Sequence, residues 1–241
     1  MQRYVVIATY NEAENIEKIL RQIAVALPEA CVLVIDDNSP DGTAQMVRRC
    51  AHDLPQVDVL VRAKREGYGP ACLMGLQEAY RRGADEIAYM DADGSHDPFD
   101  LTRLFAALQV ADVAVGSRYC EGGKITDWGW WRRLVSWAGN ELTRSWLRLE
   151  IKDFTGGFRA MRAPVVGSLH TDQITARGYA YQLQVLLTML RAGFRVIEVP
   201  IVFRDRQLGK SKFSLTMIVE ALGFLLHAHG TATPRSAGES D

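Results

Sequence analysis

The first half of the chain alternates short apolar runs with longer amphipathic stretches. The apolar runs have the length and composition of buried strands, and the stretches between them carry apolar residues at helical spacing. Strands that alternate with helices of this length predict βαβ units and a mostly parallel sheet. The expected strands are Tyr4–Ala8, Val32–Asp36, Val57–Val61, Glu86–Met90 and Asp112–Gly116. The expected helices lie near Glu14–Ala26, Thr43–Ala51, Gly69–Arg82 and Asp100–Leu108.

The length and composition of the chain predict one folded domain of ordinary polarity. Of its 241 residues, 48% are hydrophobic and 24% are charged, and a net charge of −1 gives no reason to expect nucleic-acid binding. The cysteines are scattered without C-x-x-C spacing, so we expect reduced thiols in a cytoplasmic protein. We see no signal peptide and no apolar stretch of the ~20 residues that a membrane span needs. We expect a single domain over residues 1–230 and a disordered tail over residues 231–241.

Two aspartates one residue apart follow the expected strand Glu86–Met90. Side chains at a strand end can converge where the chain turns, and ligands of open α/β sheets bind outside the carboxyl ends of the strands. A hard cation such as Mg²⁺ takes one or two protein carboxylates and completes its coordination with water and substrate phosphates. Asp91 and Asp93 are therefore candidate metal ligands. The alternative is a solvated acidic turn that Pro98 closes.

Polar and basic residues also follow the other expected strands. Asp36 and Asp37 end the second strand, where carboxylates can accept hydrogen bonds from ribose hydroxyls or a base edge. The third strand leads into a basic, glycine-containing loop, residues 62–70, whose backbone N–H groups and cations can meet a phosphate. Structural alternatives stay open, because Asp41 or Thr43 can cap a helix and such a loop can be only a turn.

Short motifs follow one another in a fixed order from residue 9 to residue 212, within a resemblance that covers roughly residues 3–228. They are TYNE (9–12), DDNSPDGT (36–43), GYGPA (67–71), DADGSH (91–96), VGSRY (115–119), FTGGFR (154–159), EVPI (198–201) and DRQLGKSK (205–212). Each motif alone is modest, but the complete series is very specific. In these motifs the chain resembles glycosyltransferase family 2 and, within it, the dolichyl/polyprenyl-phosphate mannose synthases.

This resemblance implies a GT-A-type nucleotide-diphospho-sugar transferase fold, with a Rossmann-like, mostly parallel sheet flanked by helices. It also implies GDP-mannose as the donor and Mg²⁺ or Mn²⁺ as the cofactor. Ala8 departs from the family pattern, where proline is usual, and Gln184 replaces a frequent acid, which weakens the case for a carboxylate near the acceptor. By the resemblance the metal falls at Asp91, Asp93 and Ser95. The nucleotide-sugar pocket falls at Ala8, Tyr10, Glu12, Asp37, Lys64, Gly69, Asp91, Ala92 and Asp93.

The acceptor side needs cations if the acceptor is a lipid phosphate. A phosphate with a second pKa near 6 is already charged at pH 7, whereas a hydroxyl acceptor would need a general base. Arg118 and Arg206 match the family's acceptor-phosphate positions, and we choose Arg132 over Arg133 as a third; a surface salt bridge is the alternative role for each. We expect residues 209–212 to form a loop with glycine as its hinge that closes over donor and acceptor. The expected acceptor-phosphate residues are Arg118, Arg132, Ser136, Arg206 and Lys212, and the expected catalytic residues are Asp91, Asp93, Arg118 and Arg206.

Four of the five tryptophans lie within residues 128–137, beside two arginines. Tryptophan and arginine together suit the headgroup layer of a membrane; the alternative is a helix that packs on the sheet through its tryptophan face. A second apolar helix, expected over Leu215–Leu226, spans roughly 18 Å, so it either lies on the bilayer or packs on the domain. We expect acceptor- or membrane-facing helices at about residues 128–149 and 214–228. A separate membrane-anchoring partner protein is compatible with this arrangement.

The sequence therefore predicts an inverting, metal-dependent glycosyltransferase. It would move mannose from GDP-mannose to a dolichyl or polyprenyl phosphate while bound peripherally to the cytosolic face of a membrane. The nearest alternative is a family 2 transferase that uses UDP-glucose or UDP-GlcNAc, or a hydroxyl acceptor. An alternative of another class is a catalytically silent nucleotide-sugar-binding scaffold at the membrane, and the intact acidic pair argues against it.

Overall fold

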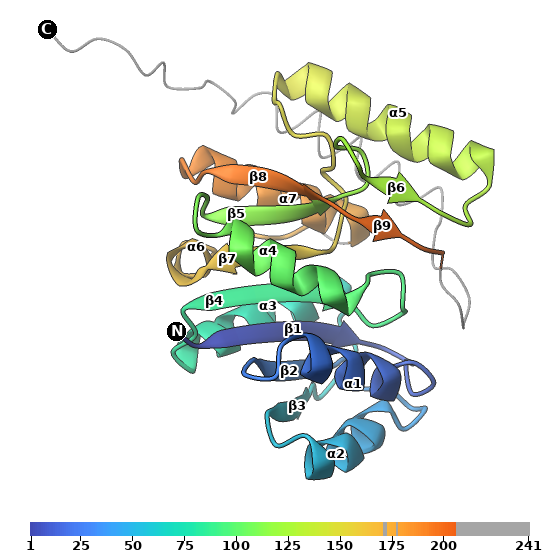
Figure 1. Ribbon diagram of the computed structural model, residues 1–241, viewed down its shortest axis with the longest axis vertical. Helices are drawn as coiled ribbons and strands as arrows, with labels where there is room; N and C mark the ends of the chain where they lie inside the picture. The colour runs from blue at the N-terminus through green and yellow to red at the C-terminus, as the bar shows by residue number, and fades with distance from the viewer. Residues whose placement is uncertain (171–172, 177, 206–241) are drawn as a thin grey trace, which may run out of the picture.

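The computed structural model describes residues 1–170, 173–176 and 178–205. Within these residues a seven-stranded sheet has the order β3-β2-β1-β4-β7-β5-β8. Its strands are β1 (Arg3–Thr9), β2 (Cys31–Asp36), β3 (Val57–Val61), β4 (Glu86–Asp91), β5 (Val113–Ser117), β7 (Arg159–Arg162) and β8 (Val196–Pro200). β7 runs antiparallel to its neighbours β4 and β5, and the other neighbouring strands are parallel (Figure 1).

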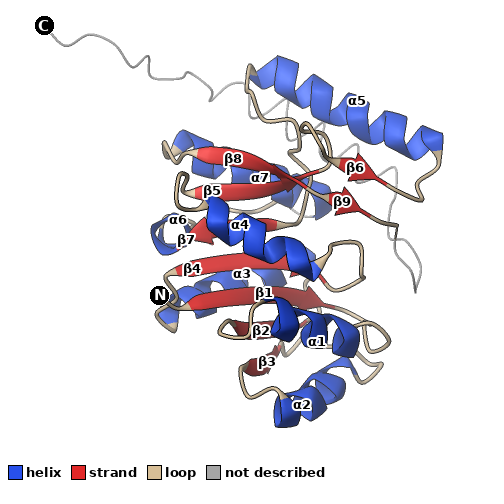
Figure 2. Ribbon diagram, viewed as in Figure 1, coloured by secondary structure: helices blue, strands red, loops and turns tan. Residues whose placement is uncertain are grey.

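Helices cover both faces of this sheet (Figure 2). They are α1 (Ile16–Ala26), α2 (Thr43–Asp53), α3 (Tyr68–Arg81), α4 (Leu101–Ala107) after the 3₁₀ turn η1 (Pro98–Asp100), α6 (Ala163–Gly167) and α7 (Gly178–Arg191). One hydrophobic core lies between the sheet and α3, α6 and α7. The other lies between the sheet and α1, α2 and α4. The sheet is therefore the middle layer of three.

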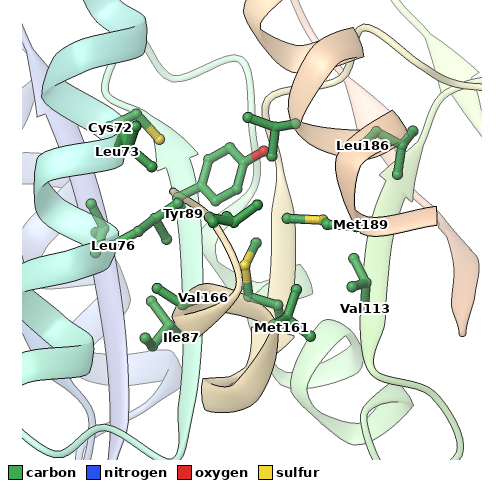
Figure 3. Packing of buried hydrophobic residues seen from close by; sticks show 14 of the residues in the cluster. Cys72, Leu73, Leu76, Ile87, Tyr89, Val113, Met161, Val166, Leu186 and Met189 are labelled. Atoms are coloured by element: carbon green, nitrogen blue, oxygen red, sulfur yellow. The ribbon is translucent and has the colours of Figure 1, made fainter. Parts of the chain in front are cut away.

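The strand sequences explain why two cores form. Successive side chains of a strand point to opposite faces, and in β1 Val5 and Ile7 enter the α1 core while Val6 enters the α3 core. Figure 3 shows part of the α3 core, where Tyr89 of β4 and Met161 of β7 pack among residues of α3 and α7. A central strand buried on both faces reads as a continuous apolar run, which is the pattern of the expected strands.

Helix α3 lies close to the sheet because it has a glycine at the contact. A Cβ added at Gly75 would lie 2.4 Å from Cγ1 of Val6 and 2.8 Å from Cγ1 of Ile35. Any larger residue would push α3 away from β1 and β2. This close contact fixes the first turn of α3, which begins at the carboxyl edge of the sheet.

A smaller pair of strands and one long helix extend beyond the main sheet. β6 (Lys124–Ile125) pairs in parallel with β9 (Val202–Phe203), and α5 (Trp130–Leu147) follows β6 in the chain. Figure 1 places α5 and α2 at opposite ends of the long axis of the molecule. Across the described part of the chain, every helix is too short or too polar to cross a membrane.

The expected α/β fold with a mostly parallel sheet is confirmed. All five expected strands are present with ends within one residue, and the four expected helices agree within two residues. The four cysteines are free. The sequence analysis did not identify β7, because this short strand begins and ends with arginine and lacks an apolar run. It also did not identify α7, β8 or the second sheet.

Candidate active site

Loops at the carboxyl edge of the sheet enclose a cavity of about 500 Å³. The parallel register aligns the strand ends, so that Ala8 of β1 lies opposite Asp91 of β4 and Thr9 opposite Asp36 of β2. Residues far apart in the sequence meet there for this reason. The expected site residues that line the cavity are Ala8, Tyr10, Glu12, Asp37, Asp91, Ala92, Asp93, Ser95, Arg118 and Arg132.

Three further expected residues do not line this cavity. Lys64 lines an adjoining hollow in the loop after β3. Gly69 lies in the first turn of α3, where an added Cβ would be 2.9 Å from the ring of Tyr181. Ser136 on α5 accepts a 2.7 Å hydrogen bond from the Tyr119 hydroxyl. Their expected roles in substrate binding remain predictions.

Several expectations fall outside the described residues. They concern Arg206, Lys212, the loop at residues 209–212, the helix expected over Leu215–Leu226 and the tail at residues 231–241. They remain predictions from the sequence.

The two candidate metal ligands lie in a tightly hydrogen-bonded turn. Oδ1 of Asp93 accepts hydrogen bonds from the backbone N–H of Ser95 at 3.1 Å and from its hydroxyl at 2.5 Å. The backbone N–H of Asp91 donates to Nδ1 of His96 at 3.2 Å, which closes the turn from the other side. The turn therefore holds both carboxylates at the end of β4, and the structure brings Ser95 into direct contact with Asp93.

The electrostatics of this turn favour a positively charged ligand. Burial, followed by the charge of Asp93, raises the pKa of Asp91 from 3.8 to about 7, although the Tyr68 hydroxyl and Arg118 act in the opposite direction. Burial lowers the pKa of His96 to about 4, so this imidazole is neutral at pH 7 and accepts the Asp91 hydrogen bond. A cation between the carboxylates would relieve their repulsion.

The acidic pair fits a cation that shares its coordination with a substrate. Among the described residues, no group of three or more His, Cys, Asp or Glu side chains has the arrangement of a metal site made by protein ligands alone. Mg²⁺ does not require one, because it is commonly held by one or two carboxylates together with water and substrate phosphates. Asp91 and Asp93 supply these carboxylates, and both line the cavity.

Asp37 organises the loop that follows β3. Its carboxylate accepts hydrogen bonds from Nη1 of Arg62 at 2.7 Å and from the backbone N–H groups of Glu66 at 3.0 Å and Gly67 at 2.7 Å. We expected this carboxylate to contact the nucleotide; Asp37 lines the cavity, and that contact remains a prediction. The same carboxylate also binds donors of the protein. Asp37 therefore positions the loop that leads into α3 at the cavity wall.

Further contacts connect the loops of the nucleotide side. The backbone N–H of Glu12 donates to Oγ1 of Thr43 at 3.0 Å, and Asp41 accepts from the Thr43 hydroxyl at 2.6 Å. These bonds join the loop after β1 to the start of α2. The guanidinium of Arg65 lies over the ring of Tyr10, 3.9 Å from its centroid. An aromatic ring and a cation therefore lie side by side here. The ring suits contact with a nucleotide base, and the cation suits contact with a phosphate.

Arg118 lies in the wall of the cavity in a fixed orientation. Its Nε and Nη2 each donate to Asp153 at 2.7 Å, and Nη2 also donates to the Thr155 hydroxyl at 2.7 Å. Asp153 is fully buried and also accepts the backbone N–H groups of Arg118 and Gly156. The Arg118 charge lowers the pKa of Asp153 despite its burial, so the pair is ionised at neutral pH.

The second arginine of the cavity lies against an aromatic side chain. Nη1 of Arg132 donates to Asp205 at 3.0 Å, and its guanidinium carbon is 4.0 Å from the centroid of the Trp128 ring. Phe203 packs edge-on against the same ring. Trp128, Phe203 and Asp205 all line the cavity together with the two arginines.

A buried polar network behind the cavity was not identified by the sequence analysis. Gln182 of α7 accepts a 2.7 Å hydrogen bond from the Tyr89 hydroxyl and donates to the Tyr68 hydroxyl at 3.3 Å. The guanidinium of Arg159 is fully buried and donates to the backbone carbonyls of Gln182 and Phe154. Residues 154–159 were recognised only as a motif, and nothing local in the sequence distinguishes a buried arginine from an exposed one.

The outer surface of α5 exposes large apolar side chains. Trp130 is 74% exposed and Trp131 is 62% exposed, and Leu134 and Trp137 are also exposed. Trp128 differs, because it is buried at 8% exposure. The tryptophans of residues 128–137 therefore divide between the cavity and the surface, a division that the sequence analysis did not anticipate.

Comparison with known proteins identifies the family. The model of glycosyl transferase family 2 matches residues 4–169. The undecaprenyl-phosphate mannosyltransferase of Micrococcus luteus is 41% identical over 222 residues, which cover 92% of this chain and 91% of that protein. This degree of identity extends through most of both chains.

Two solved structures share the fold at low sequence identity. Glucosyl-3-phosphoglycerate synthase from Mycobacterium tuberculosis, in complex with Mn²⁺, UDP and glucosyl-3-phosphoglycerate, has a TM-score of 0.73 at 19% identity, over 97% of this chain and 81% of that one. A mannosyltransferase from Pyrobaculum calidifontis, in complex with GDP-Man and Mn²⁺, has a TM-score of 0.59 at 20% identity, over 87% and 58%.

The resemblance seen in the sequence motifs is thus confirmed, and the fold is that of GT-A glycosyltransferases. The acidic pair and the arginines Arg118 and Arg132 line one cavity, and all four residues lie within the part of the chain that the family model matches. The chain is a member of glycosyl transferase family 2.

Proposed function

We propose that this enzyme transfers mannose from GDP-mannose to a polyprenyl or dolichyl phosphate. The observation that carries the proposal is a single cavity whose walls hold two carboxylates at a strand end together with the guanidinium groups of Arg118 and Arg132. Carboxylates suit a cation-bound diphosphate, and guanidinium groups suit a second phosphate. The name of the Micrococcus relative, at 41% identity, states both the sugar and this class of acceptor.

In this mechanism Asp91 and Asp93 are the residues that would hold a divalent cation, Mg²⁺ or Mn²⁺, together with the donor diphosphate. The bound cation would neutralise the charge that develops on the departing diphosphate. Arg118 and Arg132 hold the lipid phosphate, one oxygen of which attacks the anomeric carbon of mannose from the side opposite the diphosphate. The new carbon–oxygen bond forms as the bond to GDP breaks, so the anomeric configuration inverts.

The geometry of Arg118 supports its role in holding the acceptor. Its fork is fixed by Asp153 and Thr155, so little side-chain freedom is lost when a phosphate binds. A phosphate acceptor carries its own charge and requires no general base, and this agrees with Gln184, which stands where the family often has an acid. Gln184 bonds the backbone of Gln173 and Ala176.

The rival donors are UDP-sugars, because one solved structure of this fold is a complex with UDP and another a complex with GDP-Man. A transfer assay separates them. Purified protein, Mn²⁺ and a polyprenyl phosphate are incubated with labelled GDP-mannose, UDP-glucose or UDP-GlcNAc, and the lipid is extracted. We expect label in the lipid from GDP-mannose alone. Preferential use of a UDP-sugar would overturn the mannose assignment, and no turnover with any donor would favour the scaffold alternative.

We also propose that the enzyme binds a membrane peripherally through α5. Trp130, Trp131 and Trp137 are exposed there beside the exposed Arg133, and this combination of rings and a cation suits the headgroup layer. Such a surface would bring the cavity to the phosphate of a lipid whose chains remain in the bilayer.

Flotation with vesicles that contain anionic lipid tests this membrane contact. We expect the wild-type protein to float with the vesicles and a Trp130→Ser/Trp131→Ser variant to lose most of this binding. Equal flotation of the two proteins would refute a role for α5. Tyr80→Ser, a change at an exposed ring on α3, is the matched control and should leave flotation unchanged.

A further inference from the structure

Trp128 has a different environment from its neighbours on α5. Its side chain is 8% exposed, it precedes α5, and it lines the cavity that contains the acidic pair. Among the described residues, its indole N–H has no hydrogen-bond partner, so no hydrogen bond fixes the position of the ring. A buried tryptophan in the wall of the site requires an explanation other than membrane contact.

Two guanidinium groups lie over the Trp128 ring. The guanidinium carbon of Arg132 is 4.0 Å from the ring centroid, and that of Arg118 is 5.8 Å away. Both distances fall within the range of cation–π interactions, which are strongest for tryptophan. One ring therefore contacts both cations to which we assign the acceptor phosphate.

Aromatic packing limits the movement of this ring. Phe203 packs edge-on against Trp128 at 5.4 Å, and His96 packs edge-on against Phe203 at 5.4 Å. His96 in turn accepts the backbone N–H of Asp91. A continuous row of aromatic side chains thus connects the arginine side of the cavity to the end of β4.

The two arginines are held in different ways. Arg118 is fixed by two hydrogen bonds to the buried Asp153. The ion pair of Arg132 with Asp205 is more exposed, with 25% of the arginine side chain and 36% of the aspartate side chain accessible. An ion pair at such a site constrains a long side chain weakly, and the ring contact adds a constraint that the pair does not give.

We infer that Trp128 is a positioning residue for the acceptor. Its ring contacts both guanidinium groups and holds that of Arg132 in the cavity next to that of Arg118. Both cations can then bind one phosphate. The inference rests on the proposed function, in which these arginines bind the lipid phosphate. Trp128 acts through Arg132 and does not contact the reacting atoms.

Steady-state kinetics with a short, water-soluble polyprenyl phosphate test this role without a membrane. Because cation–π attraction decreases from tryptophan to phenylalanine and is lost with leucine, we expect Trp128→Leu to raise the KM for the acceptor about tenfold and Trp128→Phe to raise it less. The KM for GDP-mannose and kcat should stay near the wild-type values. Trp146→Leu, the same change near the other end of α5, is the matched control and should leave all three constants unchanged.

A double-mutant cycle shows whether Trp128 acts through Arg132. In an Arg132→Ala background, Trp128→Leu should raise the acceptor KM very little further. The same fold increase with and without Arg132, or a rise in the donor KM instead, would overturn the inference. Trp128→Phe, which keeps a ring against Phe203, permits the test if the leucine variant unfolds.

The kinetic results also separate this inference from the proposed function. If wild type forms labelled lipid and neither Trp128 variant changes the acceptor KM, only the role of Trp128 is refuted. If wild type forms none, the proposed function fails and the inference fails with it.

Discussion

Asp91 is the residue at which the requirements of folding and of function oppose each other. Its carboxylate retains 31% exposure at the cavity, yet burial and the charge of Asp93 raise its pKa to about 7. Near neutral pH the folded protein therefore keeps a charge there at a cost in stability. A divalent cation would remove this cost, because it favours the ionised form of both carboxylates. Functional sites commonly hold such destabilising groups.

The Asp91→Asn variant is expected to be more stable than wild type when EDTA removes divalent ions. A folded-state pKa raised above 3.8 gives a stabilising contribution that is complete below this value and is lost as pH rises through about 7. The melting temperature of the variant should therefore exceed that of wild type by a margin that grows from about pH 5 to about pH 8, while transfer activity disappears.

Thermal unfolding followed by circular dichroism measures this margin. Glu29→Gln removes an exposed acid outside the cavity, and this control should show no such trend. An Asp91→Asn protein less stable than wild type at about pH 8 in EDTA would contradict the electrostatic account.

Asp153 is a second residue whose contribution to stability can be tested by a single substitution, because it forms one buried ion pair with Arg118. Asp153→Asn leaves the Arg118 guanidinium buried without its carboxylate, and the loss of one partner of a buried pair costs about 3–5 kcal/mol. Urea unfolding should show this loss of unfolding free energy. Glu141→Gln, which breaks the half-exposed pair with Arg144 on α5, should cost only about 0–1 kcal/mol. Equal effects of the two substitutions would show that Asp153 is not the anchor of Arg118.

At the scale of elements, the position of α3 on the sheet controls one wall of the site. The helix begins with Tyr68, which lines the cavity and hydrogen-bonds with Gln182. The contact of Gly75 with Val6 and Ile35 sets the distance between helix and sheet. A change at this contact, which does not itself line the cavity, is therefore expected to move Tyr68 and to affect catalysis.

The Gly75→Ala variant tests this coupling. Its added methyl group would meet Val6 at 2.4 Å, and such overpacking costs typically about 1–3 kcal/mol, with a fall in kcat as α3 shifts. Gly139→Ala on α5 is the matched control, because among the described residues no atom outside the helix's own backbone lies within 4 Å of its added Cβ. The control should be neutral or up to about 1 kcal/mol more stable in urea unfolding, owing to the higher helix propensity of alanine. A stable, fully active Gly75→Ala protein would refute the role of this contact.

At the scale of the whole molecule, the sequence predicted the strands and helices whose positions follow from the local pattern of apolar residues. Apolar runs gave the five strands of the first half, and the parallel order brought their polar ends, including Asp91 and Glu12, to one cavity. It did not predict β7, whose fully buried Arg159 donates hydrogen bonds to the backbone carbonyls of Phe154 and of Gln182 on α7. Nor did it separate Trp128 from the exposed tryptophans, because burial depends on the tertiary contact with Phe203.

Some positions of the site residues likewise follow from the local sequence, and others depend on tertiary contacts. Asp91 and Asp93 follow a buried strand in the sequence, and the structure places both in the wall of the cavity, while their role as metal ligands remains a prediction. Asp37 lines the cavity and its expected contact with the nucleotide remains a prediction, but the sequence did not show that it also binds Arg62 and two backbone N–H groups of a loop about thirty residues away. The sequence gives no indication of such a contact.

The central claim is that the acidic pair at the end of β4 binds the donor diphosphate through a divalent cation, opposite the arginines. A crystal structure with Mn²⁺ and GDP-mannose, with data collected at the manganese absorption edge, tests it most directly. The account predicts one anomalous peak coordinated by Asp91, Asp93 and the diphosphate, with the anomeric carbon of mannose facing Arg118 and Arg132. A cavity that binds nucleotide without manganese, or manganese bound away from these two carboxylates, would contradict it.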